Sequence, residues 1–402
     1  MAILQRVCTP YRLELFRELS DTPDLTARVF VGDDLPDSKV QNAKDLSGVD
    51  VVRLRTRLFG AGRKTRVDHP DLVAELRRFS PHVILCEGDS HVLGYLRALW
   101  YRRRRPATGL IVWTLGRVPG GPARTRCLKS RLKSYLFGKA DAVVTYSSFG
   151  KERLVDLGLL PERIFTAVNV CATAKHRELA ESIGESKCEL RRRLGLPDRF
   201  TIVSVGSMDP DKRLDVLLRA ACRLESSRYN FVFVGNGVML ESLKALAEQQ
   251  GLDNAHFPGR IERDLPRYYK ASDVLVVPGR GGMVISEAMA YGLPVIVHQA
   301  DGTEYDLVRE RATGIRVDHG NPSDFADAIR FLCEHPSQAE AWGERAKKLI
   351  ESEFSQTQMV ARILDAIAHA RRARQGRKRS RTTQSGTGIS AMHGGRETSR
   401  WR

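Results

Sequence analysis

A glycine-rich loop with a carboxylate behind it is the part of the sequence best suited to chemistry. Segment 274–295 runs from an apolar stretch through Pro-Gly-Arg-Gly-Gly into a helical pattern. Because glycines leave backbone N–H groups open and a helix start favours anions, we expect the amides of this loop to suit a diphosphate. Glu287, in the first helical turn, is expected to accept hydrogen bonds from ribose hydroxyls. The alternative for Glu287 is a carboxylate that interacts only with the helix dipole.

A second loop of this kind follows the apolar stretch 201–205. Gly206 and Ser207 open the loop, and Lys212 stands just before the next helical pattern. Glycine allows close approach of a ligand to the backbone, and Lys212 can place a positive charge on a phosphate. Two other interpretations stay open: a capped turn with solvated charges, or a metal-binding D-x-D at 209–211, although the proline between the two aspartates fits a turn better.

A third loop carries two glycines, Gly235 and Gly237, directly after the apolar stretch 231–234. This is a G-x-G pattern without its third glycine, since Leu240 stands there, so it is a weak signal for a dinucleotide. It still predicts a tight turn close to a ligand. Because ligands of parallel sheets bind beyond the carboxyl ends of the strands, we expect the three loops to lie together.

The elements that would position these loops alternate along the chain. Short apolar stretches are separated by helical patterns, which predicts parallel strands with crossover helices. The predicted strands form two series, one at 27–31, 51–54, 83–86, 110–113 and 142–144 and one at 200–205, 231–234, 255–257, 274–277, 295–297 and 314–317. The fold class is therefore expected to be α/β, with two Rossmann-like, doubly wound domains that face a cleft.

The same patterns suggest domain boundaries. We expect a first domain at 1–172, a charged helical linker at 173–198, a second domain at 199–355, a closing helix at 356–373 and a disordered basic tail at 374–402. The tail is rich in Arg, Ser, Thr and Gly and cannot bury a core.

Composition excludes several classes of protein. The 402 residues are 42% hydrophobic and 28% charged, as in an ordinary soluble globular protein. No uncharged apolar run approaches the roughly 20 residues that span a bilayer, and the first residues do not resemble a signal peptide. The seven cysteines form no C-x-x-C pair, so neither a disulfide framework nor a zinc site is expected. The cytoplasm is the expected compartment.

The positive charge is unevenly distributed. Of the net charge of +17, residues 1–175 carry +12 and residues 371–402 carry +9. Segment 97–139 holds twelve Lys and Arg and no acidic residue, and Trp100-Tyr101 precede Arg102–Arg105 in it. Basic residues beside aromatic ones favour docking on an anionic membrane surface. A solvated helix face is the alternative; nucleic acid is not expected as a partner, because no RRM, KH or zinc-finger pattern is present.

Several segments together resemble glycosyltransferase family 4 (group 1), whose members have the two-domain GT-B architecture. The block Ser-Glu-Ala-Met-Ala-Tyr-Gly-Leu-Pro-Val-Ile at 286–296 carries most of the resemblance. Segments 205–212, 233–237, 257–261 and 268–275 match the family in order and spacing. The similarity covers about 195–355 well and is looser in the first half.

The resemblance implies a retaining, metal-independent glycosyltransferase of the hexosyltransferase type. It would need no cofactor besides a nucleotide-sugar co-substrate, and would transfer the sugar to a glycan or lipid-linked acceptor in cell-surface polysaccharide or glycoconjugate synthesis. It would work in the cytoplasm, peripherally on the inner face of the plasma membrane.

The resemblance also assigns roles to residues. Lys212 and Glu287 would be catalytic. The second domain would bind the donor through Gly206, Ser207, Gly235, Gly237, Arg260, Ile261, Arg280, Gly282, Met283, Val284 and Glu287. The first domain would bind the acceptor, with Arg12, Glu87 and Arg117 as candidates beside Asp89.

Three departures from the family pattern point to an alternative function. Gly279 stands where the first glutamate of E-x7-E is expected, Ser207 replaces an arginine, and Leu115 falls near the place of a histidine. Arg280 or Arg117 would have to supply the missing charge. The alternative is a non-catalytic, degenerate transferase that binds a sugar nucleotide or a glycan.

Overall fold

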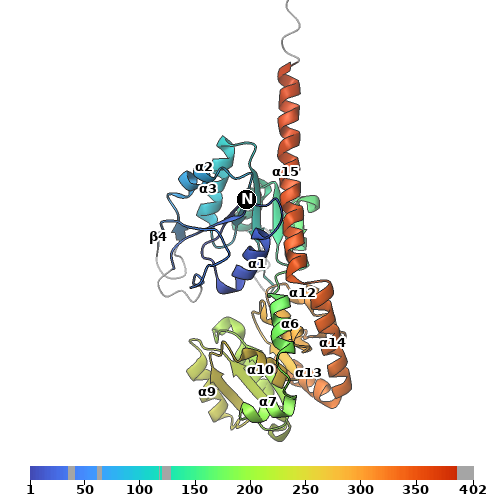
Figure 1. The fold of residues 1–402 in the computed structure, drawn as a ribbon. Helices are drawn as coiled ribbons and strands as arrows, with labels where there is room; N and C mark the ends of the chain where they lie inside the picture. The colour runs from blue at the N-terminus through green and yellow to red at the C-terminus, as the bar shows by residue number, and fades with distance from the viewer. Residues whose placement is uncertain (35–40, 61–65, 117, 120–127, 387–402) are drawn as a thin grey trace, which may run out of the picture.

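The chain folds into two α/β domains. The computed structural model describes residues 1–34, 41–60, 66–116, 118–119 and 128–386. In Figure 1 the first domain lies above the second, and helix α15 (Gln356–Gly386) runs along the upper one. Each domain is built on one parallel sheet with helices on both faces, which confirms the predicted fold class.

The first domain contains a sheet of seven parallel strands. Their spatial order is β3 (Val51–Arg53), β2 (Arg28–Val31), β1 (Ala2–Leu4), β6 (Val83–Glu87), β7 (Gly109–Thr114), β8 (Ala142–Thr145) and β9 (Ile164–Thr166). Its helices are α1 (Pro10–Ser20), α2 (Leu72–Phe79), α3 (Val92–Arg104), α4 (Leu128–Gly138) and α5 (Ser148–Asp156). Successive side chains of β1 enter opposite cores, Ile3 with α1 and α15, Leu4 with α2 and α3. Burial on both faces explains the uninterrupted apolar runs.

A two-stranded antiparallel hairpin lies beside this sheet. Strands β4 (Arg57–Phe59) and β5 (Arg66–Asp68) pair with each other, and β5 contacts α3. Arg97 of α3 donates two hydrogen bonds to the Asp68 carboxylate, at 2.6 and 2.7 Å. A bidentate pair of this kind fixes the hairpin against the helix.

The second domain contains a sheet of six parallel strands. Their order is β12 (Ala255–Gly259), β11 (Tyr229–Val234), β10 (Phe200–Val205), β13 (Val274–Val277), β14 (Val295–Val297) and β15 (Gly314–Arg316). Its helices are α8 (Leu214–Ala221), α9 (Leu240–Gln249), α10 (Leu265–Ala271), α11 (Val284–Ala290), α12 (Glu304–Leu307), α13 (Pro322–Glu334) and α14 (Pro336–Ser352). Helices α8, α9 and α13 cover one face, and α10 and α11 cover the other.

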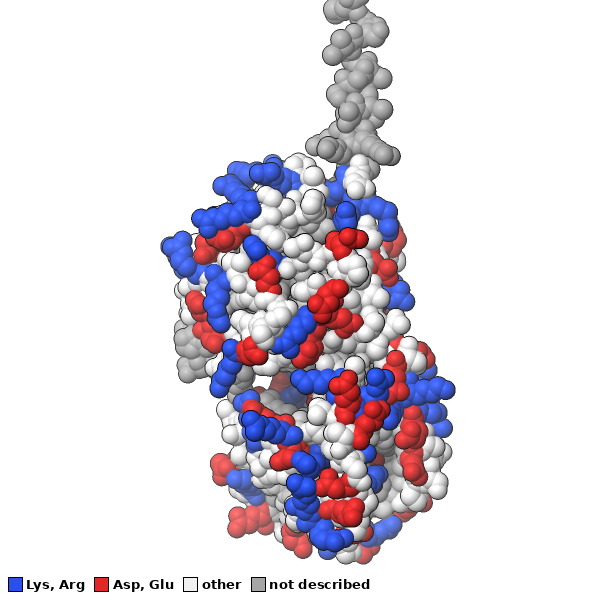
Figure 2. Space-filling model, viewed as in Figure 1, with Lys and Arg blue, Asp and Glu red and all other residues white. Residues whose placement is uncertain are grey.

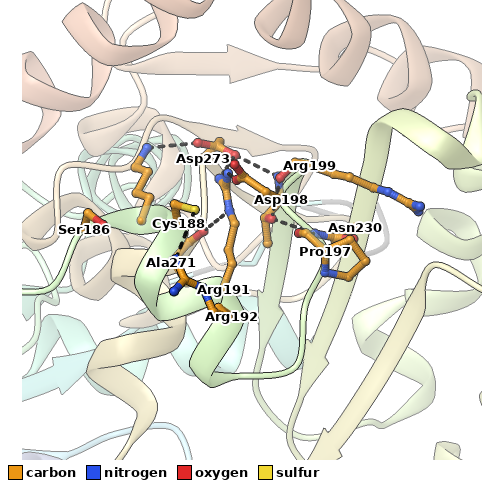
Figure 3. A network of polar contacts seen from close by, with 12 residues as sticks. Ser186, Cys188, Arg191, Arg192, Pro197, Asp198, Arg199, Asn230, Ala271 and Asp273 are labelled. Carbon is orange, nitrogen blue, oxygen red and sulfur yellow. Dashed lines mark hydrogen bonds and ion pairs between the residues drawn. The ribbon is translucent and has the colours of Figure 1, made fainter.

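The segment between the sheets is helical and packs on the second domain. It contains α6 (Thr173–Glu181), which contacts α11, and α7 (Lys187–Arg193), which contacts α10. Arg191 of α7 donates to Asp273, to Asp198 at 2.8 Å and to the backbone oxygen of Ala271 at 3.0 Å (Figure 3). Asp273 also accepts from the Thr201 backbone N–H at 2.8 Å. This network ties the linker to the amino ends of β10 and β13.

Helix α15 crosses back to the first domain. Met359, Ile363, Ile367 and Ala370 are buried against the first sheet. The helix ends at Gly386 rather than at residue 373, so residues 374–386 are helical where a disordered tail was expected. One reason is that Arg374 forms a bidentate ion pair with buried Asp141, which anchors the helix there. Residues 387–402 lie outside the described part of the chain.

The carboxyl ends of the two sheets face each other. The backbone N–H of Ser148, in α5, donates to Asp306 of α12 at 2.9 Å. The rings of Phe149 and Tyr305 stack across the same junction with centroids 4.9 Å apart. Figure 2 shows a hollow between the domains. Among the helices that the structure describes, none is long and apolar enough to cross a membrane.

Candidate active site

The donor-side loops meet where the second sheet reverses its strand order. Strands β10 and β13 are neighbours, but the helices that follow them, α8 and α11, pack on opposite faces. Ligands of open α/β sheets bind beyond the carboxyl ends of the strands at such a point. A crevice there is lined by five of the predicted donor residues: Gly206, Ser207, Lys212, Arg280 and Val284.

Lys212 is held in this crevice by the opposite loop. Its Nζ donates to the backbone oxygen of Arg280 at 2.7 Å. Burial lowers the pKa of Lys212 below the ordinary value for lysine, and the Asp211 carboxylate opposes that shift. The ammonium therefore has few water contacts to lose when an anion enters, which strengthens its interaction with a phosphate.

Gly279 and Arg280 lie against the Lys212 loop. The Arg280 backbone N–H donates to the oxygen of Asp211 at 2.8 Å, and a Cβ on Gly279 would lie only 2.4 Å from that oxygen. The half-exposed Arg280 guanidinium is 3.7 Å from the Asp211 carboxylate. A glutamate at 279 would displace the Lys212 loop, so the departure from the family pattern has a steric reason, and Arg280 supplies a second cation at the crevice.

Gly235 and Gly237 pack against the backbone of the neighbouring loop. A Cβ on Gly235 would lie 1.8 Å from the oxygen of Gly206, and one on Gly237 would lie 2.4 Å from the oxygen of Met208. The Met208 N–H donates to Asn236 at 2.9 Å. These glycines are thus needed for loop-to-loop packing, and their contact with a donor stays a prediction.

Glu287 is oriented by a tyrosine that the sequence analysis did not identify. The Tyr269 hydroxyl, from α10, donates to Oε2 of Glu287 at 2.9 Å. Burial raises the pKa of Tyr269 well above its ordinary value, and the Glu287 carboxylate adds to this, so the phenol remains a donor. Tyr269 in turn stacks on Tyr291 with ring centroids 5.0 Å apart. Glu287 lies three residues beyond Val284 on α11, about one helical turn from the crevice.

The start of α11 presents backbone donors beside the crevice. Met283 is the N-cap residue, and Gly282 before it has a φ of 150°. The first N–H groups of an α-helix have no acceptor within the helix. Those of Met283 and Val284 are therefore suited to a phosphate oxygen, and their contact with a donor stays a prediction.

Arg260 and Ile261 are placed apart from the crevice. They follow the edge strand β12, and Arg260 is exposed and pairs with Glu262 at 2.8 Å. Ile261 packs against the core. Gly259 nevertheless accepts a hydrogen bond from the Gly235 N–H at 2.8 Å, so this loop lies next to the β11 loop. Contact of Arg260 and Ile261 with a base stays a prediction.

On the acceptor side, Glu87 lies at the corresponding point of the first sheet. It ends β6, next to β1, and accepts hydrogen bonds from the Arg6 N–H at 3.4 Å and from Ser90. Arg12 is buried, with its guanidinium 4.3 Å from the Trp113 ring centroid and 5.0 Å from that of Tyr146. Arg12 therefore stabilises the core below this edge through cation–π contacts.

The remaining acceptor candidates are less informative. Asp89 accepts hydrogen bonds from Thr114 at 2.9 Å, the Leu115 N–H at 2.7 Å and Lys133 at 2.6 Å, which is a structural role. Arg117 lies outside the described residues. No group of three His, Cys, Asp or Glu side chains in the described ranges is arranged to hold a metal.

Residues 186–349 match the family Glycosyl transferases group 1. A GDP-mannose-dependent alpha-(1-6)-phosphatidylinositol monomannoside mannosyltransferase of Mycobacterium tuberculosis is 30% identical over 196 residues, which are 45% of this chain and 51% of the relative. The match thus spans about half the length of that relative. A D-inositol 3-phosphate glycosyltransferase of Thermomonospora curvata is 27% identical over 334 residues, which are 74% of this chain and 76% of the relative.

Solved structures share the whole architecture. Anabaena Alr3699/HepE, in complex with UDP, aligns over 91% of this chain and 99% of its own with a TM-score of 0.73 and 16% identity. Sucrose-phosphate synthase from Thermosynechococcus elongatus aligns over 92% and 99% with a TM-score of 0.69 and 19% identity. Residues 186–349 are therefore similar to the group 1 glycosyltransferases, and the chain has the GT-B fold.

Proposed function

We propose that the protein is a retaining, metal-independent glycosyltransferase. It transfers a sugar from a nucleotide-sugar donor to a glycan or lipid-linked acceptor in cell-surface polysaccharide or glycoconjugate synthesis. The observation that carries this proposal is the convergence of Lys212, Arg280 and the first turn of α11 at one crevice, with Glu287 one turn further along.

These groups suit the departure of a nucleoside diphosphate. When the bond between the sugar and the diphosphate breaks, negative charge grows on the leaving oxygen. Lys212 and the α11 amides, which are already held in place, would stabilise that charge without reorganising, and the half-exposed Arg280 would add a second positive charge. Glu287, fixed by Tyr269, would bind the ribose. The identity of the donor differs among the similar proteins, because one is named for GDP-mannose and one holds UDP.

The acceptor would reach the enzyme at a membrane surface, on the inner face of the plasma membrane. The half-exposed Trp100 lies beside Arg104, and the exposed Tyr135 of α4 lies beside Lys139, 4.3 Å from its ring centroid, with exposed Leu132 on the same helix. Lys and Arg side chains gather over the end of the first domain that carries α2 and α3 (Figure 2). Basic and aromatic groups together favour an anionic leaflet.

Two residues of the predicted membrane patch have other roles. Tyr101 is buried in the core of the first domain. Arg102 pairs with buried Asp141 at 3.4 Å and is largely shielded from solvent. Only Trp100 and Arg103–Arg105 of this run are available to a surface, because α3 turns Tyr101 and Arg102 toward the sheet.

A donor screen tests the proposal. We expect one of a panel of UDP-, GDP- and dTDP-sugars, at about 100 times its Kd, to stabilise the protein by about 3 kcal/mol and to raise Tm by about 5 °C or more. Lys212→Ala and Glu287→Ala should abolish this shift, whereas Lys244→Ala, on the exposed face of α9, should retain it. No shift with any donor would contradict the proposal.

The three departures from the family pattern favour the alternative function, a non-catalytic protein that binds a sugar nucleotide or a glycan. Gly279 and Ser207 remove two family side chains, although Arg280 stands beside the same crevice. A donor-induced Tm shift without sugar transfer to any glycan or lipid acceptor would favour the degenerate binding protein. Turnover that is lost in Lys212→Ala would exclude it.

A further inference from the structure

The outer face of α3 is apolar, which is unusual for a helix at a protein surface. Tyr95, Ala98 and Tyr101 bury the inner face in the core. Leu96 and Trp100, at i and i+4, are each 40% exposed on the outer face. A surface helix normally carries polar residues there, and exposed apolar patches mark sites of interaction.

This face forms one wall of a groove. The hairpin strand β4 supplies Phe59, which is 53% exposed, and α2 supplies Val73. Together with Leu93, Leu96 and Trp100 of α3, they line an open groove of about 530 Å³. That is within the usual range of small-molecule sites.

The two charged side chains in the groove pair with each other. Asp68 and Arg97 also line it, but they form the bidentate ion pair that holds the hairpin to α3. Arg97 hydrogen bonding and burial act on the Asp68 carboxyl in opposite directions, and the hydrogen bonds prevail, so its pKa is lowered and the pair stays ionised. The groove therefore offers an apolar wall with no net charge.

The two ends of the groove differ. Leu93 lies in the first turn of α3, just after the loop that follows Glu87 at the carboxyl edge of the first sheet. Trp100 lies two turns further, and there the guanidinium groups of Arg104 and Arg77 are 3.6 and 5.5 Å from its ring centroid. One end thus opens toward the proposed acceptor site, and the other is cationic.

We propose that this groove binds a hydrocarbon chain of the lipid-linked acceptor. The polar head would lie at the carboxyl edge near Glu87, and the chain would run along α3 over Leu93 and Leu96 to Trp100. The arginines at the far end would meet the anionic headgroups of the membrane from which the chain emerges. This inference rests on the proposed function and names the class of its acceptor.

Trp100 provides a direct readout. Trp113 and Trp342 are fully buried, and Trp401, outside the described residues, is replaced by Phe in every protein tested. Titration with monomeric dodecyl phosphate, below its micelle concentration, should give a saturable blue shift of Trp100 fluorescence. Leu96→Glu should weaken binding at least about tenfold, because a carboxylate would then be buried against the chain.

The matched control is Leu179→Glu on α6, where Leu179 is 38% exposed. It should bind dodecyl phosphate as the parent protein does. Circular dichroism and the donor-induced Tm shift check that Leu96→Glu is folded. Inorganic phosphate alone should produce no shift.

Three results would overturn the proposal: equal binding by Leu96→Glu and the parent, an equal shift with inorganic phosphate, or binding to anionic vesicles without binding of the monomer. The last would mean that this face only docks on a surface. Lys212→Ala should lose the donor-induced Tm shift but should still bind dodecyl phosphate. A failed donor screen and a failed dodecyl phosphate titration are therefore distinguishable.

Discussion

At the scale of single residues, the two charged groups of the proposed donor site are each positioned by a neighbouring element. Lys212 is bound to the backbone of the loop after β13, and Glu287 is bound by Tyr269 of α10. The charge of the site therefore depends on contacts between loops as much as on the residues that carry it. Two predictions concern Lys212 and the loop opposite it.

The first concerns the glycine opposite Lys212. In Gly279→Ala the new Cβ would lie 2.4 Å from the backbone oxygen of Asp211, which cannot rotate away. We expect the free energy of unfolding to fall by about 1–3 kcal/mol and donor affinity to fall with it. Gly184→Ala is the control, since no atom lies within 4 Å of its Cβ. Denaturant unfolding and calorimetry measure both effects, and equal stability of the two variants would refute the steric argument.

The second concerns pH. The pKa of Lys212 is lowered from 10.5 by burial, so its ammonium is lost at a lower pH than in an unfolded chain. Donor affinity should fall as the pH rises through the lowered pKa, while the unfolding free energy of the unliganded protein rises up to pH 10.5, because there the unfolded chain binds more protons. Calorimetric titration between pH 7 and 10 measures the affinity. Lys212→Arg should remove this decline of donor affinity with pH. If the variant and the parent protein show the same pH dependence, the decline is not due to Lys212.

The sequence identified most of this site but not Tyr269. Glycine, lysine and carboxylate positions could be predicted because loops after parallel strands converge at one edge. The partner of Glu287 could not, because it comes from a helix that the tertiary fold brings near. Its nearest signal was the Tyr-Tyr pair within the segment that resembles the family.

At the scale of secondary structure, the linker helix α7 stabilises the second sheet from the edge opposite the donor loops. Arg191 is almost fully buried and binds Asp273 at the start of β13. We expect Arg191→Ala to lower the free energy of unfolding by up to about 3 kcal/mol, because the partly buried Asp273 carboxylate then keeps only Lys187 and the Thr201 N–H as partners. The donor Kd of the folded protein should not change.

Arg192→Ala tests the same helix without the network, because Arg192 is exposed. Its unfolding midpoint in urea should match that of the parent. If Arg191→Ala is as stable as Arg192→Ala, the network does not anchor the linker.

Strands of the second domain were predicted from sequence, whereas three features of the first were not. Runs such as 231–234 are apolar on both faces and could be recognised. Strands β1 and β9 were not predicted, although β3, β14 and β15 are equally short and were, and the β4–β5 hairpin places mainly exposed, partly basic side chains outside the sheet. Burial by neighbours, which the local sequence does not show, decides these elements.

At the scale of the whole molecule, the two functions we propose fall on different parts of the surface. Donor groups lie in the second domain, and the basic and aromatic groups lie on the first. We expect replacement of Arg103–Arg105 by Gln to weaken binding to anionic vesicles roughly a hundredfold, at about 1 kcal/mol per arginine. Donor-induced stabilisation should persist. Co-sedimentation measures vesicle binding.

The charge-matched control replaces Arg192, Arg219 and Arg223, which are exposed on the second domain. It should leave vesicle binding unchanged. If both triple variants lose vesicle binding equally, net charge alone governs the attraction to the membrane.

The return of α15 also affects the order in which the two domains fold. The first sheet lacks one wall of its core until Met359, Ile363 and Ala370 have been synthesised, although its strands emerge from the ribosome first. The second domain, complete by Ser352, has all its helices before then. A released chain truncated after residue 355 should therefore contain a protease-resistant second domain and a protease-sensitive first one, so that the half made last is the half that folds first.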